Sequence, residues 1–159
     1  MPRTSWPTSL RAVAFLLLLA ACAKKPVPKT PEPPLAVSSP IELVERYSAG
    51  DGRTRWRLLD ARTRERILAE IWEWQAKLEK DPQESTRVRG RLKLGSDPWK
   101  MHPEDLAVAR LDAEKKPLRL IEAREPTLVV EEDGERREWE AVREEGTWRL
   151  RIPRTGGGR

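Results

Sequence analysis

Two dipeptides near the C-terminus, Asp133-Gly134 and Glu145-Gly146, constrain the fold of this chain more than any other feature. Asp-Gly is a preferred two-residue loop of β-hairpins, and Glu-Gly suits the same loop. Together the two turns fix a register in which apolar residues face each other on one side of a sheet and acids face bases on the other. The predicted pairs are Leu128 with Trp139, Ala141 with Leu150, Trp139 with Ile152, Glu131 with Arg136, and Glu140 with Arg151. We therefore predict an antiparallel meander with strands near 118–125, 127–132, 135–144 and 147–152.

Helical patterns precede this meander. Ser39-Pro40, followed by Glu42, is a capping box with proline at the first helical position, and it predicts a helix that ends at Gly50. Asp51 and Asp60 are placed to cap two further helices, the second closing near residues 81–82. The apolar stripe of the first helix is either Ile41, Val44 and Ser48 or Leu43, Val44 and Tyr47, and that of the third is Ile67, Ile71, Trp74 and Leu78. A short helix is expected from Pro103 to Leu111, and the alternation of Leu106, Val108 and Arg110 leaves a strand as the alternative.

Residues 87–94 do not show the helical pattern of the preceding segments, because their apolar and basic residues alternate with a period of two. The basic members are Arg87, Arg89, Arg91 and Lys93. This pattern predicts a strand with one basic side. We expect either an edge strand that its charge protects from further pairing, or a surface that contacts anionic lipid headgroups or an anionic polysaccharide.

Helices followed by a run of strands predict an α+β domain, in which N-terminal helices pack on one face of a curved antiparallel sheet. The segment with Tyr47, Gly50-Asp51 and 58–64, together with the ending 142–152, resembles the nuclear-transport-factor-2-like (SnoaL-like) superfamily over residues 40–153. The resemblance implies a cone-shaped fold with a pocket between sheet and helices, used in some members for isomerase or dehydratase chemistry. The strand predicted at 87–94 departs from that family's pattern.

The N-terminus has the three-part layout of a secretory signal, with Arg3 and Arg11 before an apolar run at 12–21. The run is shorter than the roughly twenty residues that span a bilayer. Leu19-Ala20-Ala21-Cys22 resembles the lipobox of bacterial lipoproteins. The resemblance implies cleavage before Cys22, diacylglycerol on its sulfur and an acyl group on its new amine, and Ala23 in place of aspartate implies the outer membrane. The alternative is an ordinary signal peptide that happens to contain cysteine.

Prolines dominate the segment after Cys22, which favours an extended polyproline II spacer. At about 3.1 Å per residue, it would hold a domain up to roughly 50 Å from the bilayer. A ligand for a proline-recognition domain is the alternative. The predicted organisation is a signal peptide at 1–21, a lipidated cysteine and linker at 22–40, an α+β domain at 41–153 and a disordered tail at 154–159.

The net charge of +5 and the pI of about 9.7 do not indicate a nucleic-acid partner. Much of the basic excess lies in the first forty residues, at Arg3, Arg11, Lys24, Lys25 and Lys29. From residue 41 onward acids and bases nearly balance, so no basic domain remains to contact phosphates through counterion release.

Residues suited to catalysis are scarce. His102 is the only histidine, Tyr47 the only tyrosine and Cys22 the only cysteine, so we predict no metal site, no nucleophilic pair and no cofactor beyond the lipid on Cys22. We interpret Asp51 and Asp60 as helix caps, and His102 as a residue that caps or precedes a helix. Trp74, Trp139 and Trp148 are expected in the core, whereas the candidate pocket residues are Tyr47, Trp56, Trp72 and Trp99.

These features predict a lipid-anchored protein of the cell envelope, on the periplasmic side of the outer membrane, whose domain is a non-enzymatic binding or assembly module. Its expected partners are the membrane and either an envelope protein or an anionic lipid or polysaccharide. Two alternatives stay open: a small pocket enzyme of isomerase or dehydratase type, and a structural lipoprotein without a ligand.

Overall fold

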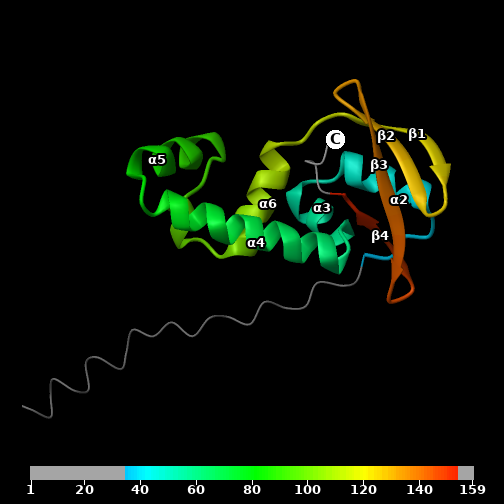
Figure 1. Cartoon of the computed structure of the whole chain (residues 1–159), viewed down its shortest axis with the longest axis horizontal. Helices are drawn as coiled ribbons and strands as arrows, with labels where there is room; N and C mark the ends of the chain where they lie inside the picture. The colour runs from blue at the N-terminus through cyan, green and yellow to red at the C-terminus, as the bar shows by residue number, and fades with distance from the viewer. Residues whose placement is uncertain (1–34, 154–159) are drawn as a thin grey trace, which may run out of the picture. The chain divides into compact units, whose positions relative to one another are not determined.

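The computed structural model describes residues 35–153, which fold into an α+β domain (Figure 1). The predicted signal peptide, the lipobox, most of the linker and the tail at 154–159 lie outside the described residues. The elements are α2 (Pro40–Ala49), α3 (Gly52–Leu58), α4 (Ala61–Leu78), α5 (Pro82–Arg91), the 3-10 helix η1 (Pro98–Lys100), α6 (Pro103–Ala113), β1 (Leu118–Arg124), β2 (Thr127–Glu132), β3 (Glu135–Glu144) and β4 (Thr147–Arg151).

The four strands form one antiparallel sheet in the order β1-β2-β3-β4. Both predicted turns are present, and each has two residues with positive φ, as a type I′ turn requires: 54° and 79° at Asp133-Gly134, and 50° and 79° at Glu145-Gly146. The register confirms the predicted pairs Leu128↔Trp139, Glu131↔Arg136, Ala141↔Leu150 and Glu140↔Arg151. The expected pairing of Trp139 with Ile152 is wrong, because β4 ends at Arg151.

The hydrophobic core lies between the sheet and the helices α2 and α3. Of the two stripes considered for α2, the one with Leu43, Val44 and Tyr47 is buried, whereas Ile41 is 51% exposed. Tyr47 meets Trp139 of β3 edge to face, with ring centroids 5.5 Å apart. Other core residues are Trp56, Leu58, Leu59, Leu106, Leu128, Val130, Ala141, Trp148 and Leu150.

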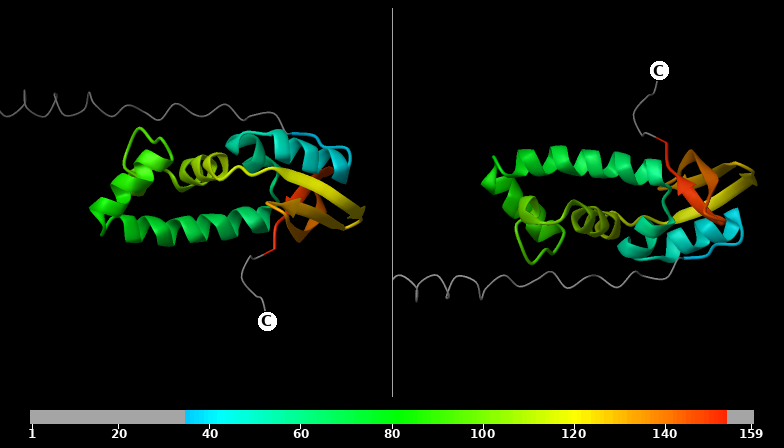
Figure 2. Two further views of the ribbon diagram at one scale, coloured as in Figure 1. Left: turned by 90° about the horizontal axis from the view of Figure 1, so that it is seen from above. Right: turned by 90° about the horizontal axis from the view of Figure 1, so that it is seen from below.

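The remaining helices extend the domain away from the sheet. In both views of Figure 2, α4 leads from the sheet toward α5, and the chain returns through α6. The predicted stripe of α4 is confirmed, since Ile71 and Leu78 are buried and Ile67 and Trp74 pack against the same core. Gln75 of α4 donates to the carbonyls of Pro98 (2.8 Å) and Met101 (2.9 Å), which holds η1 against α4.

The strand predicted at 87–94 is wrong, because the structure has α5 and a following turn there. Asp81 caps α5 by accepting from the N–H groups of Gln83 and Glu84, and Pro82 occupies the first turn. The buried apolar residues Val88 and Leu92 are four positions apart, which one helix face also satisfies. Gly90 stands where a strand would have placed an apolar side chain, so the alternation was never complete.

Candidate functional site

The candidate pocket residues do not come together in one cavity. Tyr47 and Trp56 are buried core residues of α2 and α3, Trp72 is 62% exposed on α4, and Trp99 is half-buried in η1. Burial raises the pKa of Tyr47 to about 12, and the Arg55 guanidinium lies 5.0 Å from its ring centroid. The tyrosine is therefore a packing residue with a neutral hydroxyl.

The basic residues at 87–93 do not form a single stripe. They lie on α5 and the turn after it, where residues two apart along a helix point in nearly opposite directions. All four are exposed; Arg87 pairs with Glu84 at 3.5 Å, and Arg89 pairs with Asp97 at 3.5 Å. Their contact with an anionic surface stays a prediction, without the linear arrangement that a strand would have given it.

The residues interpreted as caps occupy those positions. Asp51 accepts from Thr54 N at 2.8 Å, and Asp60 accepts from Thr63 N at 2.9 Å. His102 precedes α6, and its Nδ1 accepts from Glu104 N at 3.3 Å. All three side chains thus satisfy the N–H groups at helix N-termini.

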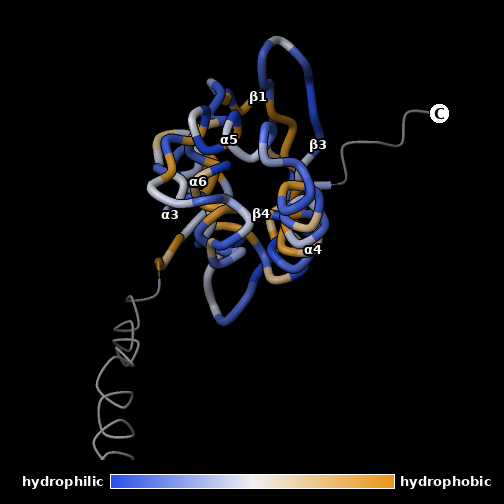
Figure 3. The backbone as a smooth tube through the Cα atoms, turned by 90° about the vertical axis from the view of Figure 1, so that its left-hand side faces the viewer, coloured by the Kyte–Doolittle hydropathy of each residue, from blue (hydrophilic) through white to orange (hydrophobic). Residues whose placement is uncertain are grey.

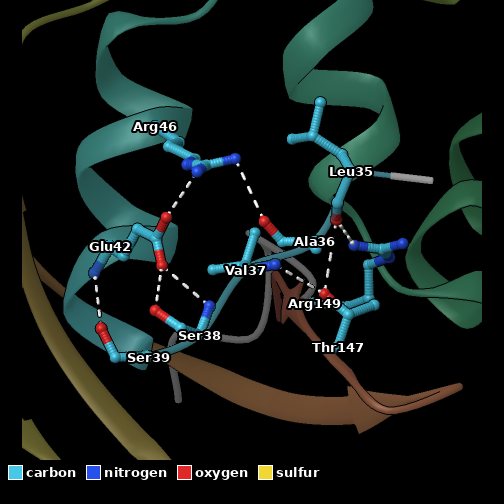
Figure 4. A network of polar contacts seen from close by, with 9 residues as sticks. All are labelled: Leu35, Ala36, Val37, Ser38, Ser39, Glu42, Arg46, Thr147 and Arg149. Carbon is cyan, nitrogen blue, oxygen red and sulfur yellow. Dashed lines mark hydrogen bonds and ion pairs between the residues drawn. The ribbon is translucent and has the colours of Figure 1, made fainter. Parts of the chain in front are cut away.

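The arrangement with the most specific long-range contacts is the tether junction, which we define as Leu35–Ser39 with Glu42, Arg46, Thr147 and Arg149 (Figure 4). Residues 35–39, which the proline-rich composition predicts as linker, are bonded to two elements of the fold. Val37 is buried, its N–H donates to Thr147 Oγ1 at 2.9 Å, and its carbonyl accepts from Trp148 N at 3.4 Å. The segment thereby covers part of the outer edge of β4.

The carbonyl of Leu35, the first described residue, is held by two side chains of β4. Thr147 Oγ1 donates to it at 3.3 Å, and Arg149 Nη1 donates at 3.1 Å. Thr147 is buried and uses its hydroxyl both as an acceptor, from Val37, and as a donor, to Leu35. One side chain thus fixes two residues of the incoming chain.

Helix α2 holds the same segment from its other side. Arg46 Nη1 donates to the Ala36 carbonyl at 3.1 Å, and its other nitrogen pairs with Glu42 at 2.6 Å. Glu42 also accepts from the N–H (2.8 Å) and the hydroxyl of Ser38, while Ser39 caps the helix. The bonds from the Ser38 hydroxyl and the Ser38 N–H lower the pKa of Glu42 most, burial opposes them, and the Arg46 charge lowers the pKa further, so the carboxylate is ionised at neutral pH.

Charged side chains of both signs lie beside the junction. A cavity of about 460 Å³ lies there, lined by Ala61, Arg64, Glu144, Glu145 and Arg149. Burial lowers the pKa of Arg149, and the charges of Arg64 and Arg57 lower it further, while Glu144 and Glu145 oppose the shift. Glu144 in turn accepts from Ala61 N, at the first turn of α4, at 3.0 Å.

Only part of the tether junction was visible in the sequence. The capping box marked Ser39 and Glu42, but Thr147 and Arg149 lie about 110 positions from their partners, and no local pattern connects them.

Between residues 35 and 153 no cluster of three or more histidine, cysteine or acidic residues could hold a metal ion. In the same range, no helix has the length and apolar character needed to cross a membrane.

Comparison of the chain with known protein families, with curated proteins and with solved structures finds no match.

Replacing Thr147 by valine should release the tether junction without unfolding the domain. Valine has nearly the same shape but loses both hydroxyl bonds and leaves the Val37 N–H and Leu35 carbonyl with one partner fewer, at a cost of about 1–3 kcal/mol. Amide hydrogen exchange should accelerate at residues 35–39 while exchange in β2 and β3 changes little. Thr86→Val, which removes an exposed hydroxyl bond within α5, is the control. Equal protection of 35–39 in both variants would contradict this assignment.

Proposed function

We propose that this chain is a lipid-anchored protein of the cell envelope, and that the domain at 35–153 is a binding or assembly module rather than an enzyme. The observation that carries the proposal is the lipobox-like sequence 19–22, followed by a proline-rich spacer and then by the tether junction. A linker that leads from a membrane anchor must enter the domain at a fixed place. Residues 35–39 would provide such a place, because they bond to both α2 and β4.

The use of the titratable side chains favours a module over a pocket enzyme. His102, Asp51 and Asp60 each accept a backbone N–H at a helix start, and Tyr47 is packed against Trp139. These side chains therefore have structural roles.

The module would face the periplasm from the outer membrane. Its partners would be the membrane and either an envelope protein or anionic lipid or polysaccharide, the latter contacted through Arg87, Arg89, Arg91 and Lys93.

We also propose that the domain is a divergent relative of the nuclear-transport-factor-2-like folds. Its helices come first, two of them pack on the core face of the sheet, and the strands follow as a meander with the predicted register. The segment at 87–94, which as a strand would have departed from that family, is a helix. The cone-shaped arrangement of that family is part of the same proposal.

Metabolic labelling of the full chain with an alkyne-bearing fatty acid tests the anchor. We expect the parent chain to be labelled, and Cys22→Ala to lose the label entirely and accumulate as uncleaved precursor, because the thioether cannot form. Ala23→Asp is the matched control, since it should keep the label and shift the protein toward the inner membrane on fractionation. A parent chain that carries no label, or a Cys22→Ala chain that keeps it, would refute lipid anchoring.

A further inference from the structure

Strand β3 is longer than the strand beside it, and half of one edge lies open. β3 spans Glu135–Glu144, but β4 pairs with it only from Glu140 to Glu144. Along the other half lies a cavity of about 830 Å³, lined by the consecutive residues 135–140 together with Thr127, Arg151 and Pro153. Consecutive residues point to opposite faces of a sheet, so a cavity that all of them line runs along the strand's edge.

Within the described residues, the chain that follows β4 does not pair with this edge. Instead of continuing β4, Ile152 bonds to α4: its N–H donates to Thr63 Oγ1 at 3.3 Å, and its carbonyl accepts from Arg66 at 2.8 Å. Pro153, which in the same register would face Glu138, has no N–H to donate to a ladder. The local sequence thus ends β4 at Arg151, and among residues 35–153 the start of β3 has no strand partner on that side.

The backbone groups at the open edge can be assigned by the alternation of an antiparallel strand. Ala141 N donates to the Pro126 carbonyl at 2.8 Å, on the side of β2, so the odd-numbered residues of β3 bond toward β2. The even-numbered Arg136 and Glu138 therefore direct their N–H and C=O groups to the open edge. Both side chains are exposed, and Figure 3 shows this part of β3 as hydrophilic.

We infer that the open edge of β3 binds a second copy of this chain, β3 against β3, about a two-fold axis at Arg137. In that register Arg136 of each copy lies opposite Glu138 of the other. Both members of each pair aim their backbone groups across the interface, which gives four backbone hydrogen bonds and two Arg–Glu contacts. The contact is isologous, so it closes as a dimer rather than continuing as a fibre.

The order of the charged residues along β3 favours this register, and it favours a second copy of the chain as the partner. A shift by two residues in either direction would place Arg136 opposite Arg136 or Glu138 opposite Glu138, and like charges directly opposite are destabilising. At the axis Arg137 faces Arg137, but each already pairs within its own copy with Glu132 (3.0 Å) and Glu135 (3.1 Å). The edge is thus complementary to itself, and a second copy is the occupant that this complementarity specifies. The dimer deepens the assembly role proposed above, on which it rests.

A single cysteine at the axis tests the dimer. Arg137 and its counterpart form a non-hydrogen-bonded pair with Cα atoms about 4.5 Å apart, within reach of a disulfide. The full-length Arg137→Cys chain, oxidised with copper phenanthroline, should shift from the monomer to the dimer band on a non-reducing gel. Arg143→Cys is the matched control: it lies on the same strand and the same face, but it is opposite Trp148 of β4 and should stay monomeric.

Charge reversal tests the register. Added to Arg137→Cys, Arg136→Glu should abolish the dimer band by facing acid with acid, and the further change Glu138→Arg should restore it. All chains are run with Cys22 intact and again with Cys22→Ser, so the result does not depend on lipidation. Loss of fatty-acid labelling would refute the anchor and leave the dimer standing. Three results would overturn the dimer: a monomeric Arg137→Cys chain, equal cross-linking at Arg143→Cys, or no response to charge reversal. A monomeric chain would indicate that the open edge of β3 pairs with a different polypeptide.

Discussion

The Gly52→Ala variant should lose about 3 kcal/mol of its free energy of unfolding, because a methyl group at this position meets backbone rather than a movable side chain. Gly52 begins α3, and an added Cβ would lie 2.2 Å from the Val108 carbonyl oxygen and 2.9 Å from Asp112 Cβ, both on α6. The Gly52 N–H also donates to Asp112 Oδ1 at 3.0 Å. The two helices therefore approach each other through a glycine, and alanine would push them apart.

Gly90→Ala is the matched control for this substitution. Gly90 lies within α5, and nothing stands within 4 Å of an added Cβ. The same change should stabilise the chain by about 0.5–1 kcal/mol, because alanine loses less conformational entropy in a helix. Urea unfolding followed by far-UV circular dichroism measures both. If the two variants were destabilised alike, or Gly52→Ala were neutral, the close contact of α3 and α6 would be contradicted.

The sheet was predictable because its information is local. The turns at 133–134 and 145–146 each join adjacent strands, and two residues with positive φ fix the register of everything beside them. The caps at Ser39, Asp51 and Asp60 are equally local, since each bonds to an N–H three residues further on. At these two turns and three caps, the sequence was sufficient.

The errors arose where tertiary contacts decide. At 87–94 a short alternation competed with the Asp81 cap and with a helix face that buries Val88 and Leu92, and the helix formed. At 152 the strand pattern continued, but Thr63 and Arg66 of α4 bond to the backbone there. The contacts of Thr147 and Arg149 in the tether junction and the open edge of β3 both depend on such distant partners, so the sequence predicted neither.

Asp60→Asn should destabilise the chain by about 2 kcal/mol, because it removes the charge of a buried carboxylate that accepts from Arg151, a side chain that is one-third exposed and also pairs with Glu140 at 3.2 Å. Asp60 is fully buried; it caps α4 through Thr63 N at 2.9 Å and accepts from Arg151 Nε at 2.7 Å. Its own N–H donates to the Leu150 carbonyl at 2.9 Å, so one residue joins α4 to the edge of β4. Asparagine can keep the cap but not the ion pair.

Asp51→Asn is the control, because Asp51 caps α3 in an exposed position where asparagine caps as well as aspartate, and we expect a change within about 0.5 kcal/mol. Both variants are measured by urea unfolding at neutral pH. Similar losses in the two would mean that Asp60 contributes only as a cap, and a neutral Asp60→Asn would contradict its role in joining α4 to β4.

The pH dependence of the Asp60 effect should identify the carboxylate as its source. Burial raises the pKa of Asp60, but the hydrogen bonds from Thr63 and Arg151 outweigh it, and the net pKa in the folded chain is lowered. A lowered carboxyl pKa contributes stability that is complete above the unfolded value of about 3.9 and is lost as the pH falls through the folded pKa. The difference in unfolding free energy between parent and Asp60→Asn should therefore be constant from pH 7 to about 5 and shrink below about 4.

Glu42 and Asp51 also have lowered pKa values but are present in both chains, so the subtraction isolates Asp60. A difference that grew on acidification would show that the carboxyl is protonated in the folded chain and that the pair with Arg151 is not ionic.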